Sequence, residues 1–176
     1  MAVHPKPLVF NRQFLKWLGS FWGAWNSVEL TLSFAIGACL GIPHEQTHIL
    51  TSGIEFGRKA ALLRNLVYQT NMPHKGKIIG LIGKLQNEAK RNAIAHGIIA
   101  SDEATVTFIE QARGGDYRTT SYQFTLKAFA AHVIMIASIA EQLCIEFQIS
   151  EDELFRFAAA ALRADRKATT SPVPPS

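Results

Sequence analysis

The first half of the chain has the hydrophobic pattern of helices, preceded by a short polar arm at residues 1–11. Apolar side chains recur at spacings of three and four over residues 14–36, the periodicity of a helix that buries one face. Asn26 or Ser27 offers an N-cap at which a new helix could begin inside this stretch. Gly41 and the proline that follows it are typical of a helix end.

Two more helical patterns follow, over residues 43–70 and 76–95, and Gly97 stands where a C-terminal stop is expected. Near the end of the chain, a long apolar pattern predicts a helix over residues 126–147. Ser150, followed three residues later by a glutamate, is a capping-box signal for a last helix that ends near residue 163.

Between these helices the pattern changes to that of strands. Residues 105–109 are β-branched or aromatic, and residues 117–124 carry threonines and aromatics after Gly114-Gly115-Asp116. Two strand-like runs around a glycine turn predict a hairpin. Because a lone hairpin is marginally stable, it must pack against the helices or against a second subunit.

These patterns predict an all-α fold, an up-and-down helical bundle with one β-hairpin inserted near residues 104–125. The length of 176 residues favours a single domain, over residues 12–165, between the polar arm and a proline-rich tail. The tail, residues 166–176, is expected to be disordered. Only 18% of residues are charged and 48% are apolar, which excludes a disordered chain and indicates that a partner covers some apolar surface.

The chain is expected to be cytoplasmic, without a membrane span. Its longest charge-free apolar stretches, residues 30–42 and 128–140, are much shorter than the roughly 20 residues that a membrane helix needs. No signal peptide is evident in the first residues. Cys39 and Cys144 are too few for a disulfide framework, so both are interpreted as small core residues in a reducing compartment.

Positive charge collects between Arg58 and Arg91, where eight basic residues face a single acidic one, Glu88. The whole chain carries a formal charge of +4, so the remainder is net negative. A polarised surface of this kind attracts polyanions, although lysines and arginines on two helices can also simply solvate an outer face. The candidate nucleic-acid contacts are Arg64, Lys75, Lys77, Lys84 and Lys90.

Two short motifs contain residues that carry chemistry. In the first, His44 and His48 flank Glu45 in an H-E-x-x-H arrangement. On a helix this places two imidazoles one turn apart, able to hold zinc, with the glutamate as a base for metal-bound water. The motif follows a proline directly, and nothing singles out Glu55 or Glu88, the possible third ligands, so a zinc metallopeptidase is the less favoured interpretation.

The second motif runs from Arg91 to Gly97 and ends the basic segment. Arg91 offers a permanently charged fork for a phosphodiester, His96 can pass protons near neutral pH, and Asn92 can orient the ring or bind a hydroxyl. Arg91 and His96 stand five residues apart, about 140° round a helix axis, so they are not expected to converge within one chain. A two-fold homodimer would let each cleft take one residue from each chain.

This motif resembles the R-x-x-x-x-H signature of the HEPN superfamily, in its common form with a polar residue after the arginine. The order of helices is similar as well, with Trp25-Asn26-Ser27-Val28-Glu29 in one helix and Gly57-Arg58-Lys59-Ala60 in the next. The resemblance covers about residues 14–148, and the hairpin departs from the minimal bundle of the family.

The resemblance implies a homodimer and metal-independent RNA cleavage, in which the 2′-hydroxyl attacks the neighbouring phosphate. His96 is then the general acid/base, Arg91 stabilises the charged phosphorane and Asn92 positions the pair, with Glu29 and Lys59 in support. No cofactor is expected. The family context implies RNA and a cognate antitoxin or regulatory protein as partners. The alternative from a different class is a non-catalytic RNA- or protein-binding module on the same fold.

Overall fold

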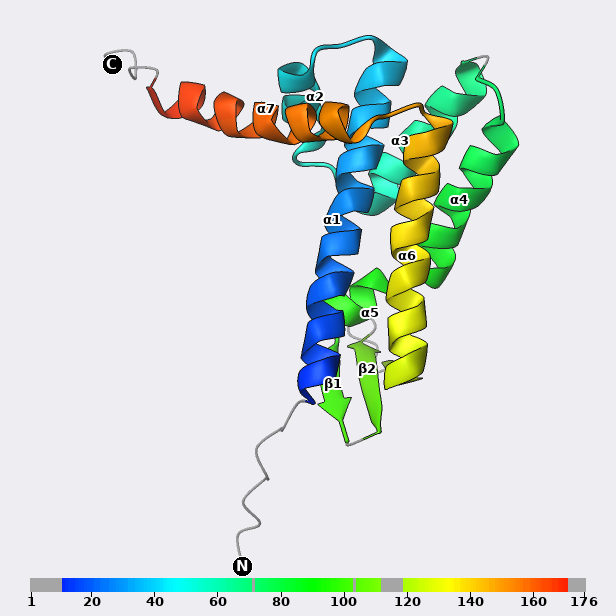
Figure 1. Cartoon of the computed structure of the whole chain (residues 1–176). Helices are drawn as coiled ribbons and strands as arrows, with labels where there is room; N and C mark the ends of the chain where they lie inside the picture. Colours follow the sequence, from blue (N-terminus) through cyan, green and yellow to red (C-terminus); the bar gives the residue numbers. More distant parts are fainter. Residues whose placement is uncertain (1–10, 71, 103, 112–118, 171–176) are drawn as a thin grey trace, which may run out of the picture.

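The computed structural model describes residues 11–70, 72–102, 104–111 and 119–170. The protein is mostly helical, with a small three-stranded antiparallel sheet (Figure 1). The helices are α1 (Arg12–Leu40), α2 (His44–Thr51), α3 (Phe56–Gln69), α4 (Lys75–Glu88), α5 (Arg91–His96), α6 (Leu126–Glu146) and α7 (Glu151–Thr170). The strands are β1 (Ile98–Ser101), β2 (Thr105–Gln111) and β3 (Thr119–Thr125).

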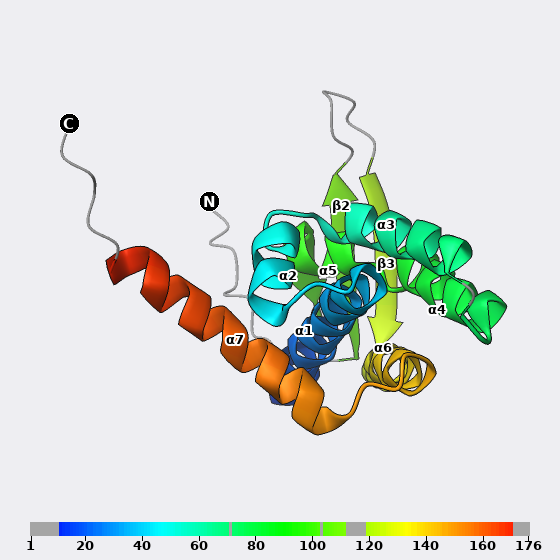
Figure 2. The ribbon, with the colours of Figure 1, turned by 90° about the horizontal axis from the view of Figure 1, so that it is seen from above.

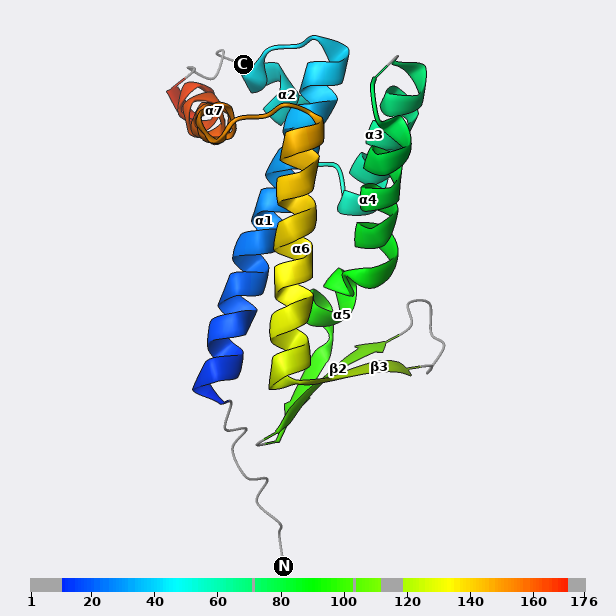
Figure 3. The same cartoon turned by 45° about the vertical axis from the view of Figure 1, so that its right-hand side comes forward.

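Helices α1 and α6 lie side by side along the long axis of the molecule, and α3 and α4 pack behind them (Figures 1 and 3). Both α1 and α6 start at the end where the sheet lies, so they run in the same direction. The predicted up-and-down order is therefore wrong for this pair. The reason is that α4, α5 and the sheet return the chain to the starting end before α6 begins.

Helix α1 is one continuous helix of 29 residues, so neither Asn26 nor Ser27 begins a new one. The Ser27 hydroxyl instead donates to the main-chain carbonyl of Gly23, inside the helix. Gly41 ends the helix with a φ of 67°, in the left-handed conformation that glycine adopts without steric cost.

Each of the two following helical patterns is divided in the structure. The pattern at residues 43–70 forms α2 and α3, with a loop between them at residues 52–55. The pattern at residues 76–95 forms α4 and α5, separated at Lys90, which has a φ of 51°. Apolar periodicity continues across Lys90 because α4 and α5 bury their apolar faces in one core. Helix α2 differs, since it buries Thr47 and Thr51 and leaves Ile49 and Leu50 exposed.

The predicted hairpin is present as β2 and β3, paired from Thr105 opposite Thr125. Its predicted glycine turn lies outside the described residues. A third strand, β1, which the sequence analysis did not predict, pairs with β2. The sheet packs on the bundle through Phe108, which is fully buried with its ring centroid 6.1 Å from that of Phe14 and 5.5 Å from that of Phe129.

The capping box before α7 is confirmed. The main-chain amide and hydroxyl of Ser150 donate to the Glu153 carboxylate, at 2.8 and 2.7 Å, and the Glu153 amide donates back to the hydroxyl. Helix α7 crosses the end of the bundle and projects beyond it (Figure 2). It continues to Thr170, past the predicted end near Arg163 and through the first part of the expected tail. The rest of that tail, and residues 1–10 of the expected arm, lie outside the described residues.

In length and composition, α6 could cross a membrane, although no such span was predicted. Helices α1 and α2 together meet the same criteria but are bent by 118°. These observations are weak evidence for a membrane protein, because the core helix of a soluble protein meets the same criteria. Helix α6 packs on α1, α4 and β3, as a core helix does, and the fold is compatible with a soluble protein.

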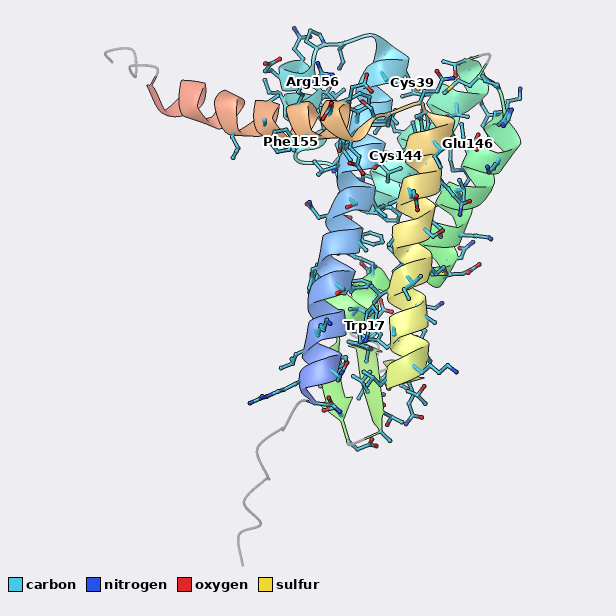
Figure 4. The ribbon with its side chains drawn as sticks, in the orientation of Figure 1. Trp17, Cys39, Cys144, Glu146, Phe155 and Arg156 are labelled. Carbon is cyan, nitrogen blue, oxygen red and sulfur yellow. The ribbon has the colours of Figure 1, made fainter. Side chains whose placement is uncertain are left out.

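The two cysteines are free thiols on different helices, Cys39 on α1 and Cys144 on α6 (Figure 4). Burial raises the pKa of the Cys39 thiol. The sulfur of Cys144 lies 3.3 Å from the Thr31 hydroxyl. Both side chains are only half-buried, so they lie at the edge of the packing and not in the core as expected, with Cys39 packed against it.

Candidate active site

The short helix α5 carries the arginine–histidine motif, and Lys90 separates it from α4. Lys90 adopts the left-handed conformation, which costs a residue with a Cβ about 1 kcal/mol. Two contacts hold it there: its ammonium donates to the Asn87 carbonyl at 2.8 Å and lies 5.1 Å from the centre of the Tyr122 ring. On the other side of the break, His132 of α6 hydrogen-bonds the Ala89 carbonyl at 2.9 Å. The break is therefore fixed by α6 and the sheet.

The other end of α5 is fixed by Gly97. Its backbone is extended, with a φ of −73°, so the predicted stop is present but not as a left-handed cap. A Cβ on this residue would overlap the Ala93 carbonyl oxygen and would lie 2.9 Å from that of Ile109 on β2. Glycine is needed here because the main chain at the end of α5 packs directly against the main chain of the sheet, which leaves no space for a side chain. Buried Ala93 and Ile94 anchor the same helix in the core.

Arg91 and His96 meet within one chain. The distance from Arg91 Nη1 to His96 Nε2 is 3.0 Å, so the prediction that they diverge is wrong. Arg91 is the first residue of α5, and its long side chain runs along the short helix and reaches the ring at its other end. An angle measured round the helix axis takes no account of the length of an arginine side chain.

The contact also defines the form of the imidazole. A guanidinium has donors only, so Nε2 of His96 accepts this hydrogen bond and the ring is neutral with its proton on Nδ1. Asn92 Oδ1 accepts a second, longer bond from the same Nη1, at 3.4 Å. Arg91 Nε is buried without a hydrogen-bond partner among the described residues, which leaves this guanidinium with an unused donor.

Glu29 and Lys59 form an ion pair beside this cluster, between α1 and α3. Lys59 Nζ donates to Glu29 Oε2 at 2.8 Å. The lysine side chain is only 10% exposed and the glutamate 26%, so each partner neutralises a charge that would be costly to bury alone.

All five residues proposed for the active site line one open cavity of about 660 Å³. This volume lies within the roughly 300–1,000 Å³ of small-molecule sites. Its lining combines the Arg91–Asn92–His96 cluster, the Glu29–Lys59 pair, Gln86 from α4 and residues 52–57 at the start of α3. The cavity therefore presents a guanidinium, a neutral imidazole and a carboxamide from one short helix.

The five basic residues proposed as nucleic-acid contacts do not line this cavity. Lys77 is ion-paired with Glu146 at 2.5 Å, at the end of α6 (Figure 4), and Arg64 donates to Gln86 at 3.3 Å. The pKa of Glu146 is lowered, mainly because Lys77 donates to its carboxylate. Lys75 and Lys84 are exposed on α4. These five cations thus lie outside the pocket, unlike Lys59 of α3, and several of them have internal partners.

The H-E-x-x-H residues lie elsewhere, against α7. His48 stacks on Phe157 with ring centroids 3.9 Å apart, and its Nε2 lies 2.6 Å from the Phe157 carbonyl oxygen. His44 packs edge-on against the same ring. Among the described residues, no group of three histidine, cysteine, aspartate or glutamate side chains is placed to hold a metal ion. These imidazoles contribute to the packing between α2 and α7.

The sequence analysis missed the wall of the cavity formed by residues 52–57, and it missed Gln86. The one available signal was the pair Gly53 and Gly57, which flank a short break in the helical pattern. Comparison with known protein families, curated proteins and solved structures found no match to the chain.

Proposed function

We propose that this protein is a metal-independent endoribonuclease of HEPN type. The observation that carries the proposal is the 3.0 Å contact between Arg91 and His96 at the edge of an open cavity. Cleavage of RNA by its own 2′-hydroxyl requires a cation that binds the phosphate and a group that moves protons. Arg91 and His96 place these two groups side by side in solvent-accessible space.

In the proposed reaction, the phosphodiester draws the Arg91 guanidinium away from His96 and onto its non-bridging oxygens. The freed Nε2 lone pair then takes the proton of the 2′-hydroxyl, and that oxygen attacks the neighbouring phosphorus. The bond to the 5′ oxygen breaks, leaving a 2′,3′-cyclic phosphate. Arg91 stabilises the additional negative charge of the phosphorane, and Asn92 holds the guanidinium in position.

Glu29 and Lys59 support this arrangement from the neighbouring wall. Their ion pair fixes the facing sides of α1 and α3, against which the substrate must lie. The basic residues of α3 and α4 attract RNA to this part of the molecule without reading its sequence.

A cytoplasmic homodimer is part of the proposal. The contact within one chain removes the geometric reason for a shared cleft, but one histidine cannot easily serve both the attacking and the leaving oxygen. The same residue of a second copy, protonated on both ring nitrogens and released from its Arg91, would supply the proton to the 5′ oxygen and become neutral. Exposed apolar side chains, such as Trp22 on α1 and Ile134 on α6, are consistent with a covered face. An antitoxin or regulatory protein is the partner that the family resemblance implies.

The second candidate is a non-catalytic RNA-binding module. The observation that favours it is the same hydrogen bond, because a base whose lone pair is occupied by a guanidinium does not act until that guanidinium moves. A module of this kind retains RNA in a salt-sensitive manner and leaves it intact.

The test is incubation of the purified full chain with mixed single-stranded RNA in EDTA. We expect cleavage by the wild type and a loss of about 100-fold or more in His96→Ala. Arg91→Gln should lose activity to a similar degree, whereas His44→Gln, which lies outside the cavity, should retain it. Retention of RNA without cleavage would favour the binding module, and equal cleavage by His96→Ala would overturn the proposal.

A further inference from the structure

One wall of the cavity has no role in the proposed chemistry. It consists of residues 52–57, from the loop after α2 to the start of α3, and it adjoins the wall that holds Arg91 and His96. Cleavage of a phosphodiester requires only the wall that carries Arg91 and His96. We therefore expect another part of the ligand to occupy the space beside residues 52–57.

An aromatic ring stands in this wall. Phe56 is half-buried and lines the cavity, and it packs edge-on against Trp25 with ring centroids 4.7 Å apart. Trp25 is itself in the core, only 3% exposed, so Phe56 is supported from behind. A fixed aromatic side chain at the edge of a phosphate site is the usual platform on which a nucleobase stacks.

Two glycines keep the same wall open. Gly53 and Gly57 both line the cavity, and a Cβ added to either would meet nothing within 4 Å. Neither has a positive φ. The fold therefore does not need glycine at these positions, and the effect of the two missing side chains is to leave free space in the pocket.

The polar groups of the pocket offer both acceptors and donors to the edges of a purine. Glu55 is the N-cap of α3 but makes no capping hydrogen bond, so its carboxylate offers two acceptors. Gln86 accepts from Arg64 through Oε1, which leaves its amide hydrogens as donors. Guanine presents adjacent N1–H and N2–H donors beside the acceptors O6 and N7, whereas adenine presents an acceptor at N1 that a carboxylate repels.

We propose that residues 53–57 and Gln86 form a nucleobase subsite that selects guanine next to the scissile phosphate. The base stacks on Phe56, Glu55 accepts its N1–H and N2–H, and Gln86 donates to its acceptor edge. The inference rests on the proposed function only for the position of the phosphate, at Arg91 and His96.

Calorimetric titration of the full chain with the 3′-monophosphates of guanosine, adenosine, cytidine and uridine tests the subsite without any cleavage. We expect guanosine 3′-monophosphate to bind about tenfold or more tightly than the other three, since that is the effect of one well-placed pair of hydrogen bonds. Glu55→Gln should remove the preference, because guanosine 3′-monophosphate binds more weakly while adenosine 3′-monophosphate, no longer facing a carboxylate, binds at least as tightly as before. The matched control, Glu45→Gln on α2, should leave both affinities unchanged.

A second pair of variants separates loss of the pocket from loss of folding. Gly57 and Gly76 are the second residues of α3 and α4, and neither has a neighbour near an added Cβ. Both Gly57→Ala and Gly76→Ala should melt at or above the wild-type temperature, because alanine favours helix. Only Gly57→Ala should bind guanosine 3′-monophosphate more weakly, by about fivefold or more.

Equal affinity for the four nucleotides, or unchanged binding in both Glu55→Gln and Gly57→Ala, would overturn the subsite. Guanine preference together with intact RNA would support the subsite and reject the nuclease. Cleavage that depends on His96 but does not vary with the neighbouring base would support the nuclease and reject the guanine subsite.

Discussion

Gly97 connects the motif helix to the sheet at the scale of a single residue. The α5 backbone reaches the β2 backbone there, with the carbonyl oxygens of Ala93 and Ile109 occupying the space that a side chain would need. Both neighbours are main-chain atoms, which cannot rotate out of the way. The position of His96, one residue earlier, therefore depends on the absence of a methyl group at Gly97.

Gly97→Ala should destabilise the protein by about 2–4 kcal/mol, because α5 and β2 must separate to admit the methyl group. Gly80→Ala, on the exposed side of α4 with open space around it, should be neutral or stabilising by up to about 1 kcal/mol. Urea unfolding followed by circular dichroism measures both. A Gly97→Ala protein as stable as the wild type would show that the α5–β2 contact is looser than described.

The same residues show what the sequence could and could not reveal about the site. The residue types and spacing of Arg91, Asn92 and His96 identified them as candidates for the site. Their contact was not evident, because it depends on the break at Lys90 and on the length of one arginine side chain. The cavity wall formed by residues 52–57 was missed because its glycines and phenylalanine belong to no recognisable motif.

At the scale of elements, His132 joins α6 to the break between α4 and α5. Its ring is partly buried beside Phe124 and hydrogen-bonds the Ala89 carbonyl. Burial is the main cause that lowers the pKa of His132 below its ordinary value of 6.5, and the nearby charge of Lys90 acts in the same direction. The folded protein therefore favours the neutral ring at this junction.

The stability of the wild type should fall as the pH is lowered through about 6.5. As the pH falls, the unfolded chain takes up the proton first because the pKa of His132 is lower in the folded state. His132 therefore contributes its full stability above the unfolded-state pKa, and this contribution is lost as the pH falls towards the folded-state pKa. His132→Gln, which can still donate to Ala89, should lose less between about pH 7.5 and 5.5. Urea midpoints at the two pH values measure this, and an equal decrease in both proteins would contradict the role assigned to His132.

Element types were predictable from the sequence because helices and strands bury residues with different periods. The capping box of α7 and the pairing of β2 with β3 both follow from local residue types. The division at Lys90 was not predictable, since the same core receives the apolar faces of α4 and α5 on both sides of that break. Strand β1 is short and half-exposed, so it carries little pattern of its own.

At the scale of the whole molecule, the fold places a small sheet at one end of a helical bundle and α7 across the other (Figures 1 and 3). The candidate site is formed by α1, α3, α4 and α5 together with the loop before α3. Residues far apart in the chain, such as Glu29 and His96, therefore meet in one cavity. The sequence associated Glu29 and Lys59 with the motif only through the family resemblance, because no local pattern specifies where α1 and α3 lie relative to the motif helix.

The chemistry of the cut RNA ends tests the central claim most directly. The substrate is an RNA that the wild type cleaves at one position, compared with the same RNA carrying a single 2′-deoxynucleotide there. The account predicts a 2′,3′-cyclic phosphate on one product, a 5′-hydroxyl on the other and no cleavage of the deoxy-substituted RNA. Cleavage of the substituted RNA at the same position, or products ending in 5′-phosphate and 3′-hydroxyl, would contradict it.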